Sequence, residues 1–236
     1  MPEFLLGKPA ESLNYDVYFQ WGFIWKKAGN AILSLEPDYY NGEPSYLMKL
    51  TGKTTPFFDK VTKVRDTLVA YTSHRIKPLH YEKVVHEGDY KAKDLLKYNY
   101  PESGTNGHVK IYRSGTLRRD TMIHVSGEAY DMLSVFYFLR QKDLASMKPG
   151  EIINTTVFSG RHAHKVQIQY LRDDQYKAPK NKVYDCYVFK VLFYDEKGKL
   201  DKNDNIDVWI SRTPGKRPVH MAGKLKVGYL RAIINE

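Results

Sequence analysis

The stretch DMLSVFYFLRQK, residues 131–142, is where the alternating pattern of the chain gives way to a helical one. Asp131 is a suitable N-cap for a helix over these residues. At 100° per residue, Ser134, Tyr137 and Gln141 form a narrow polar stripe. Apolar side chains cover most of the remaining surface: Met132, Leu133, Val135, Phe136 and Leu139. A helix that is apolar over so much of its circumference is predicted to be largely buried.

Strand-like sequence precedes this segment. In residues 15–21, Tyr15, Val17, Phe19 and Trp21 share one face, as in a strand with one buried side. The pair Asn41-Gly42 is a hairpin signal. Further strands are predicted at residues 25–35, from 46 onward, and at 64–72, 77–86, 89–98, 108–113 and 121–125.

One short interruption and a second run of strands complete the pattern. Thr55 is a suitable cap and Pro56 suits a first helical position, so a short helical turn is predicted near residues 56–62. After the helix, strands are predicted at residues 166–170, 183–194, 206–211, 219–222 and 225–234. Neither run of strands has another helix to cover its apolar face. The sequence therefore predicts a mainly β fold, with one highly curved antiparallel sheet around the helix. Residues 1–236 are expected to form one β domain with its core at about 13–234.

Composition limits the classes of function. The 37 basic and 27 acidic residues give a net charge of +10, which attracts polyanions. The lysines are spread along the chain, however, as on an ordinary solvated surface. No apolar run approaches the ~20 residues that a membrane-spanning helix needs. Residues 1–6 do not resemble a signal peptide, so the protein is either cytosolic or begins after a removed leader.

His162 and His164 form the only His-x-His sequence. In a strand both imidazoles share a face, and such a pair can begin a metal site. A cupin-like site also needs an acidic residue nearby, and residues 165–170 contain none. We therefore expect a structural role for the pair, with His162 and His164 as weak metal candidates only.

Catalytic motifs are missing from the sequence. There is no Gly-x-Ser-x-Gly, phosphate loop, dinucleotide fingerprint or His-Glu-x-x-His. Ser134 lies in the apolar helix, and Cys186, the single cysteine, lies in an apolar strand where a small core residue is expected. Basic and aromatic residues interleave at 90–100 and 108–118, which suits single-stranded nucleic acid, but lysines on edge strands explain them better. We predict no catalytic residue and no cofactor, and nucleic acid is an unlikely partner.

Several strings, in order, resemble the bacterial family called domain of unknown function 3108. Residues 21–31 (WGFIWKKAGNA) are similar to its early Ile-x-x-Gly-x-Ala strand, although Phe23 and two tryptophans depart from that pattern. Residues 52–66 resemble its aromatic-Asp turn. Residues 130–140 resemble its Asp-x-x-Ser-x-x-Tyr-x-x-Arg helix. Cys186, residues 207–211 and the segment Arg217-Pro218-Val219 are similar to its closing segments.

This resemblance implies an unclosed β-barrel with a helix in its concavity, similar to periplasmic lipoprotein carriers. It implies an exported protein of the periplasm or cell envelope, with its leader absent from this sequence. The family has no established activity, so the resemblance transfers no catalytic residue.

The leading hypothesis is a non-enzymatic envelope protein, expected to be a monomer, that binds a lipid, a lipoprotein or another amphipathic envelope component. A curved sheet with apolar inner residues forms a concave pocket. Arg140 is a candidate to meet an anionic headgroup. The alternatives are a scaffold or protein-interaction module with a filled interior, a nucleic-acid binder, and an unrecognised enzyme. The candidate lining residues are Phe57, Phe58, Phe136, Tyr137 and Phe138.

Overall fold

A computed structural model describes residues 10–195, 197–200, 205–225 and 227–236. Its helices are α2 (Pro56–Asp59), α3 (Ser134–Arg140) and a short 3-10 helix, η1 (Pro179–Asn181). Its strands are β1 (Glu11–Trp21), β2 (Ile24–Tyr40), β3 (Glu43–Thr54), β4 (Arg65–Thr72), β5 (Pro78–Glu87), β6 (Tyr90–Asn99), β7 (Thr105–Arg113), β8 (Thr116–Val125), β9 (Ile152–Ser159), β10 (His162–Lys177), β11 (Val183–Tyr194), β12 (Ile206–Ser211), β13 (Pro218–Lys224) and β14 (Tyr229–Ile234).

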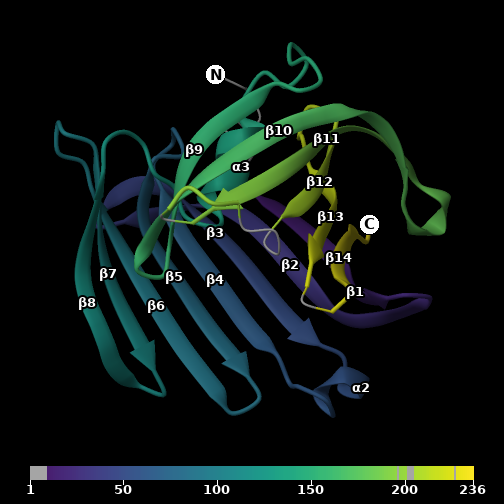
Figure 1. Cartoon of the computed structure of the whole chain (residues 1–236), viewed down its shortest axis with the longest axis horizontal. Helices are drawn as coiled ribbons and strands as arrows, with labels where there is room; N and C mark the ends of the chain where they lie inside the picture. Colours follow the sequence, from purple (N-terminus) through teal and green to yellow (C-terminus); the bar gives the residue numbers. More distant parts are fainter. Residues whose placement is uncertain (1–9, 196, 201–204, 226) are drawn as a thin grey trace.

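All the described strands belong to one antiparallel sheet, in the order β8-β7-β6-β5-β4-β3-β2-β1-β14-β13-β12-β11-β10-β9. Except for β8 and β9, strands that are consecutive in sequence lie side by side, and the pairing of β1 with β14 joins the two halves of the chain. Figure 1 shows β9, β10 and β11 curving back across the sheet, with α3 inside the curve. Within the described ranges β8 and β9 are edges that do not pair with each other, so the prediction of a highly curved, unclosed sheet is confirmed.

The alternating pattern is clearest where only one face of a strand is covered. In β7, Thr105, Gly107, Val109 and Ile111 are buried in turn, and the residues between them are more exposed. The first five residues of β8 are all exposed, because this strand is an edge. Polar residues are tolerated there on both sides, and the strand therefore begins five residues before the predicted 121–125.

Strand β9 was not predicted, and its burial explains why. The successive residues Val157 and Phe158 are both buried, because each faces a different apolar cluster of the interior. Such a strand shows no alternation in sequence. Its free edge is partly covered by Tyr130, whose N–H donates to the Thr156 carbonyl and whose carbonyl accepts from the Phe158 N–H. Tyr130 thus occupies part of the β9 edge, with which β8 would have to pair to close the barrel.

Helix α2 forms at the predicted place but ends at Asp59 rather than residue 62. The Thr55 hydroxyl accepts a hydrogen bond from the Phe58 N–H, and Pro56 occupies the first turn. Both features match the capping role expected from the sequence. The Asp59 carboxylate pairs with Arg65 at the start of β4 (Nη2–Oδ2 2.7 Å), which fixes the turn against the sheet.

Helix α3 is shorter than the predicted 131–142, because a capping turn and a 3-10 turn replace its ends. The Asp131 carboxylate accepts hydrogen bonds from the N–H groups of Leu133 and Ser134, each at 2.9 Å. The Ser134 hydroxyl accepts one from the Asp131 N–H, which completes a reciprocal capping box. Burial raises the pKa of Asp131 despite these donors. After Arg140, the Lys142 N–H donates to Leu139 three residues back.

The two sides of α3 pack against opposite walls of the sheet. Leu133 and Tyr137 belong to a cluster that includes Leu13, Leu33 and Met48 of strands β1 to β3. The other side packs against β10 to β12: Val135, Phe138 and Leu139 join Val166, Ile168, Phe189 and Val208. The prediction that this helix is buried is confirmed. In the part of the chain that is described, none of the helices has the length and apolar character needed to cross a membrane.

Arg140 ties the end of α3 to the first strand of the sheet. Its two terminal nitrogens donate to the two carboxylate oxygens of Glu11 at 2.7 and 2.8 Å, and one also donates to the Gly215 carbonyl at 2.7 Å. The guanidinium lies 4.8 Å from the centre of the Tyr137 ring. Arg140 is 1% exposed and Glu11 8%, so the pair is desolvated and each ion depends on the other.

The side chain of His220 in β13 is also buried, on the opposite face of the sheet from Val208 of β12. The His220 ring packs against both Trp209 and Tyr176, with ring centres 4.5 and 4.6 Å away, and those two rings also contact each other with centres 6.0 Å apart. Neither ring nitrogen has a hydrogen-bond partner among the described residues. Burial, with a contribution from the nearby Arg231 charge, lowers the pKa of His220 to about 4. The imidazole is therefore neutral in the native protein at neutral pH.

The variant Arg140→Met tests the buried ion pair. It leaves the Glu11 carboxylate buried without its cation, and we expect the free energy of unfolding to fall by about 3–5 kcal/mol. The measurement is chemical denaturation followed by tryptophan fluorescence. Arg212→Met is the matched control, because it removes an equally short contact to Asp173 (2.6 Å) whose side chains are exposed. Losing this exposed pair should cost much less stability than losing the buried one, and equal losses would contradict the assignment.

The variant His220→Phe tests the stacked histidine. The unfolded chain binds a proton near pH 6.5 and the native chain only near pH 4. The native state of the wild type should therefore lose up to about 3 kcal/mol relative to His220→Phe as the pH falls from 7 to 4. Denaturation midpoints at pH 7, 5.5 and 4 measure this difference. Parallel declines in the two proteins would show that His220 does not titrate as described.

Candidate functional site

An apolar cavity of about 550 Å³ lies beside α3 and is lined by residues of β3 and of strands β9 to β14. Met132 and Phe136 line it from the helical segment, and Leu50 lines it from β3. Most of the remaining wall is also apolar: Val157, Phe193, Ile206, Met221, Leu230 and Ala232. Its volume is within the range of about 300–1,000 Å³ that is typical of small-molecule sites.

The cavity reaches the surface at the turn between β13 and β14. Lys224, Leu225 and Leu230 line it there and are exposed. Other polar lining residues come from the neighbouring strands and turns: Ser159, His164, Asp195 and Asn205. The site thus combines an apolar wall with a few polar groups, which suits an amphipathic molecule.

Gly223 of β13 is one reason why this space is not filled. A Cβ added at Gly223 would meet no heavy atom within 4 Å, and Gly223 is not among the glycines with positive φ. Gly29 of β2, by contrast, is required by a contact: a Cβ there would lie 2.3 Å from the Lys53 carbonyl oxygen. A glycine inside a strand without such a reason often marks a place that a ligand approaches closely.

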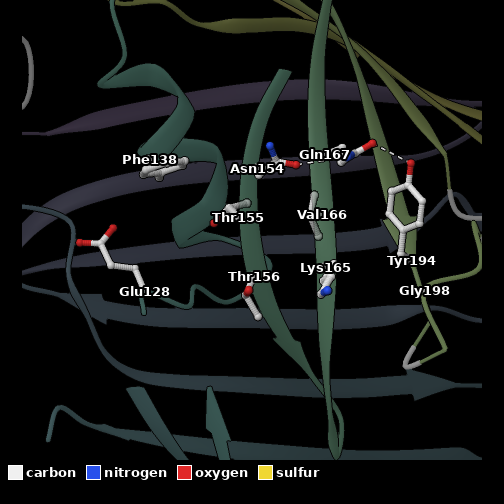
Figure 2. Close-up of a pocket in the computed structure, with 10 residues that line it drawn as sticks. All are labelled: Glu128, Phe138, Asn154, Thr155, Thr156, Lys165, Val166, Gln167, Tyr194 and Gly198. Carbon is white, nitrogen blue, oxygen red and sulfur yellow. Dashed lines mark hydrogen bonds between the residues drawn. The ribbon is translucent and has the colours of Figure 1, made fainter. Parts of the chain in front are cut away.

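A second hollow, of about 700 Å³, is more polar (Figure 2). The Tyr194 hydroxyl donates to the Gln167 side-chain oxygen at 2.6 Å, and the Gln167 amide donates to Asn154 at 3.2 Å. Figure 2 shows this row running across β9, β10 and β11, with Phe138 and Glu128 on the far side of β9. These polar groups satisfy one another. Glu128 likewise accepts a hydrogen bond from the Tyr130 hydroxyl at 2.9 Å.

The six residues expected to line a pocket are not brought together. Of the three aromatic residues expected on α3, Phe136 lines the apolar cavity, Phe138 lines the polar hollow, and Tyr137 is fully buried in the core. Phe57 is 67% exposed on α2 and contacts Phe58 edge-on. Neither of these two is among the lining residues of the described cavities.

Arg140 does not occupy the position that a headgroup-binding residue requires. Its guanidinium is paired with Glu11, and it is not a lining residue of either cavity. The expectation that it meets an anionic headgroup is therefore corrected. The reason is long-range: Glu11 lies 129 residues away in sequence, so no local pattern could reveal the pairing.

His162 and His164 share a face, as expected, with ring centres 6.0 Å apart. The Arg161 Nε donates to His162 Nε2 at 2.8 Å, and His164 lines the apolar cavity. Across the described residues, no group of three or more His, Cys, Asp or Glu side chains could hold a metal ion.

Neither candidate nucleophile has a reactive setting. Ser134 uses its hydroxyl in the capping box of α3. Cys186 is fully buried, and burial raises the pKa of its thiol to about 12, so the thiolate is not formed at neutral pH.

Apart from Phe136, the residues that line the cavity were missed by sequence reasoning. Met221, Gly223, Leu230 and Ala232 lie on the last two strands, where alternation predicts only which side chains face inward. Gly223 was the one local signal, because it interrupts a strand without a turn. Its meaning depends on α3 lying opposite, and that is a tertiary fact.

Comparisons with known proteins agree with this architecture. The family model described as "Protein of unknown function (DUF3108)" matches residues 14–235. Among solved structures, a β-barrel-like protein of domain of unknown function DUF1849 from Brucella abortus is similar, with a TM-score of 0.62, 11% identity, and coverage of 97% of this chain and 96% of that chain. At that identity the likeness concerns the fold alone. No curated protein gives a significant match, and neither finding indicates an enzyme family. Because the family model covers nearly the whole chain, this protein belongs to the DUF3108 family.

Proposed function

We propose that this protein binds an amphipathic, lipid-like ligand in the apolar cavity and has no enzymatic activity. The observation that carries the proposal is the open, mainly apolar space of about 550 Å³ beside α3. An acyl chain or similar apolar group would lie against Phe136, Met221 and Ala232. Its polar end would lie at the exposed turn beside Lys224.

Two further observations support this proposal. The open surroundings of Gly223 keep one wall of the cavity free, although any larger apolar residue would stabilise the strand better. Leu50 lies on the opposite wall, and Gly52, two residues further along β3, has similarly open surroundings. A scaffold protein with a filled interior, the main alternative, gains nothing from leaving this space.

The compartment forms part of the same proposal. We infer the periplasm or cell envelope, where lipids and lipoproteins are moved between membranes by carriers with similar curved sheets. The resemblance to exported proteins supports this inference. Fractionation of cells that express the native gene, with an antibody against this chain, tests it, and a purely cytoplasmic signal would contradict it.

Binding of cis-parinaric acid, a fluorescent fatty acid, tests the cavity. The variant Gly223→Phe should place its ring in this space, because a Cβ at Gly223 meets no heavy atom within 4 Å, and we expect at least a 10-fold weaker affinity after solvent extraction of bound lipid. Gly223→Ala should bind nearly as well as the wild type. Fluorescence titration and native mass spectrometry of freshly purified protein provide the measurements.

The control variant is Ser34→Phe. Ser34 lies on the face of β2 opposite the buried Leu33 and Leu35, so the added ring does not enter the cavity. It should leave the affinity unchanged. Equal affinities of Gly223→Phe and Ser34→Phe, or no binding by the wild type, would overturn the proposal.

A further inference from the structure

Two neighbouring hairpin turns expose apolar side chains that a soluble surface does not need. Between β1 and β2, Phe23 is fully exposed and Trp21 is 57% exposed, with Trp25 beside them. Between β13 and β14, Val227 and Tyr229 are exposed, as is Leu225. Hairpin turns are normally built from Gly, Asn, Asp and Ser, so this composition calls for a reason beyond turn formation.

The two turns lie side by side and form one surface. Gln20 pairs with Tyr229 across β1 and β14. The backbones touch so closely that a Cβ at Gly228 would lie 2.2 Å from the Gln20 carbonyl oxygen and 3.3 Å from the Trp21 Cβ. We call the six exposed side chains the hairpin-tip surface: Trp21, Phe23, Trp25, Leu225, Val227 and Tyr229.

Positive charge borders this surface. The segments 20–27 and 224–231 contain no Asp or Glu, and they supply Lys26, Lys27, Lys224 and Arg231. The Arg231 guanidinium lies 5.5 Å from the ring centres of both Trp25 and Tyr229, so it joins the two turns. Lys27 is paired with Asp16 of β1 at 2.6 Å.

Aromatic rings flanked by Lys and Arg match the interfacial region of an anionic bilayer. Trp and Tyr prefer the headgroup level, where their apolar rings are buried and their polar edges stay wet. Each basic residue near an anionic membrane surface adds to the electrostatic attraction. Protein interfaces also favour aromatic residues, but they are depleted in lysine.

We propose that the hairpin-tip surface docks this protein onto a bilayer that contains anionic lipid, with Phe23, Trp21 and Val227 entering the interface. The turn between β13 and β14 also carries Lys224, Leu225 and Leu230, which line the apolar cavity. Docking therefore brings the opening of the cavity to the membrane. The docking itself depends only on the two turns and stands whether or not the cavity binds a ligand.

Flotation with vesicles tests the proposal. We expect the wild type to float with vesicles of phosphatidylcholine and phosphatidylglycerol at 7:3, and to lose most of this binding in phosphatidylcholine alone or at high salt. The double variant Trp21→Ser/Phe23→Ser should bind at least 10-fold more weakly. Both residues are exposed, so the fold should be retained, as circular dichroism can verify.

Tyr39→Ser is the matched control. Tyr39 is 67% exposed and lies at the opposite end of β2 from Phe23, so its loss should not affect vesicle binding. The chain has three tryptophans, so Trp209→Phe leaves only Trp21 and Trp25 as reporters. Their emission should shift to shorter wavelength on anionic vesicles and be quenched by brominated lipid.

Three results would overturn the proposal. These are no flotation with anionic vesicles at low salt, equal flotation of the wild type and the double variant, or a concentration-dependent dimer that the double variant abolishes, which would assign the surface to self-association. Because cis-parinaric acid binding reports on the cavity separately, failure of vesicle binding is distinguishable from failure of the proposed function.

Discussion

The buried pair of Arg140 and Glu11 is the interaction on which the rest of this structure depends. It joins the end of α3, the helix inside the curve of the sheet, to the first strand, next to the seam where β1 pairs with β14. An unclosed sheet needs something to hold its concave face together, because its edges are not hydrogen-bonded to each other. A buried, bidentate ion pair holds α3 against β1 in one orientation, which apolar packing alone does not specify.

The position of α3 then determines where the interior is filled and where it is open. The capping box of Asp131 and Ser134 fixes the start of the helix, and Arg140 fixes its end. Between them, the helix packs tightly toward β1–β3 and toward β10–β12. The space beside Met132 and Phe136 stays open, and two positions on the facing strands, Gly223 and Ala232, carry small residues. The cavity is thus a consequence of helix placement and of Gly223 and Ala232.

The apolar cavity and the hairpin-tip surface lie at one end of the molecule. The cavity opens at the turn between β13 and β14, and the same turn forms half of the hairpin-tip surface. A protein that takes up an apolar molecule from a membrane must avoid exposing that molecule to water on the way. In the proposed docking, the aromatic side chains of the hairpin-tip surface would hold the opening of the cavity against the membrane. Neither the exposed turns nor the open cavity is explained by a contribution to stability. Uptake of a ligand from a membrane would explain both.

The sequence by itself determined the β pattern, the cap at Thr55 and Pro56, and the burial of the helix, because these depend on periodicity and on neighbours within a few residues. It also singled out Phe23 and the tryptophans as unusual. It could not show β9, where Val157 and Phe158 face different clusters. It placed Arg140 in a binding role and grouped six side chains that the fold separates. Only the tertiary structure decided these points, because the partner of Arg140 is 129 residues away and the cavity is bounded by distant strands.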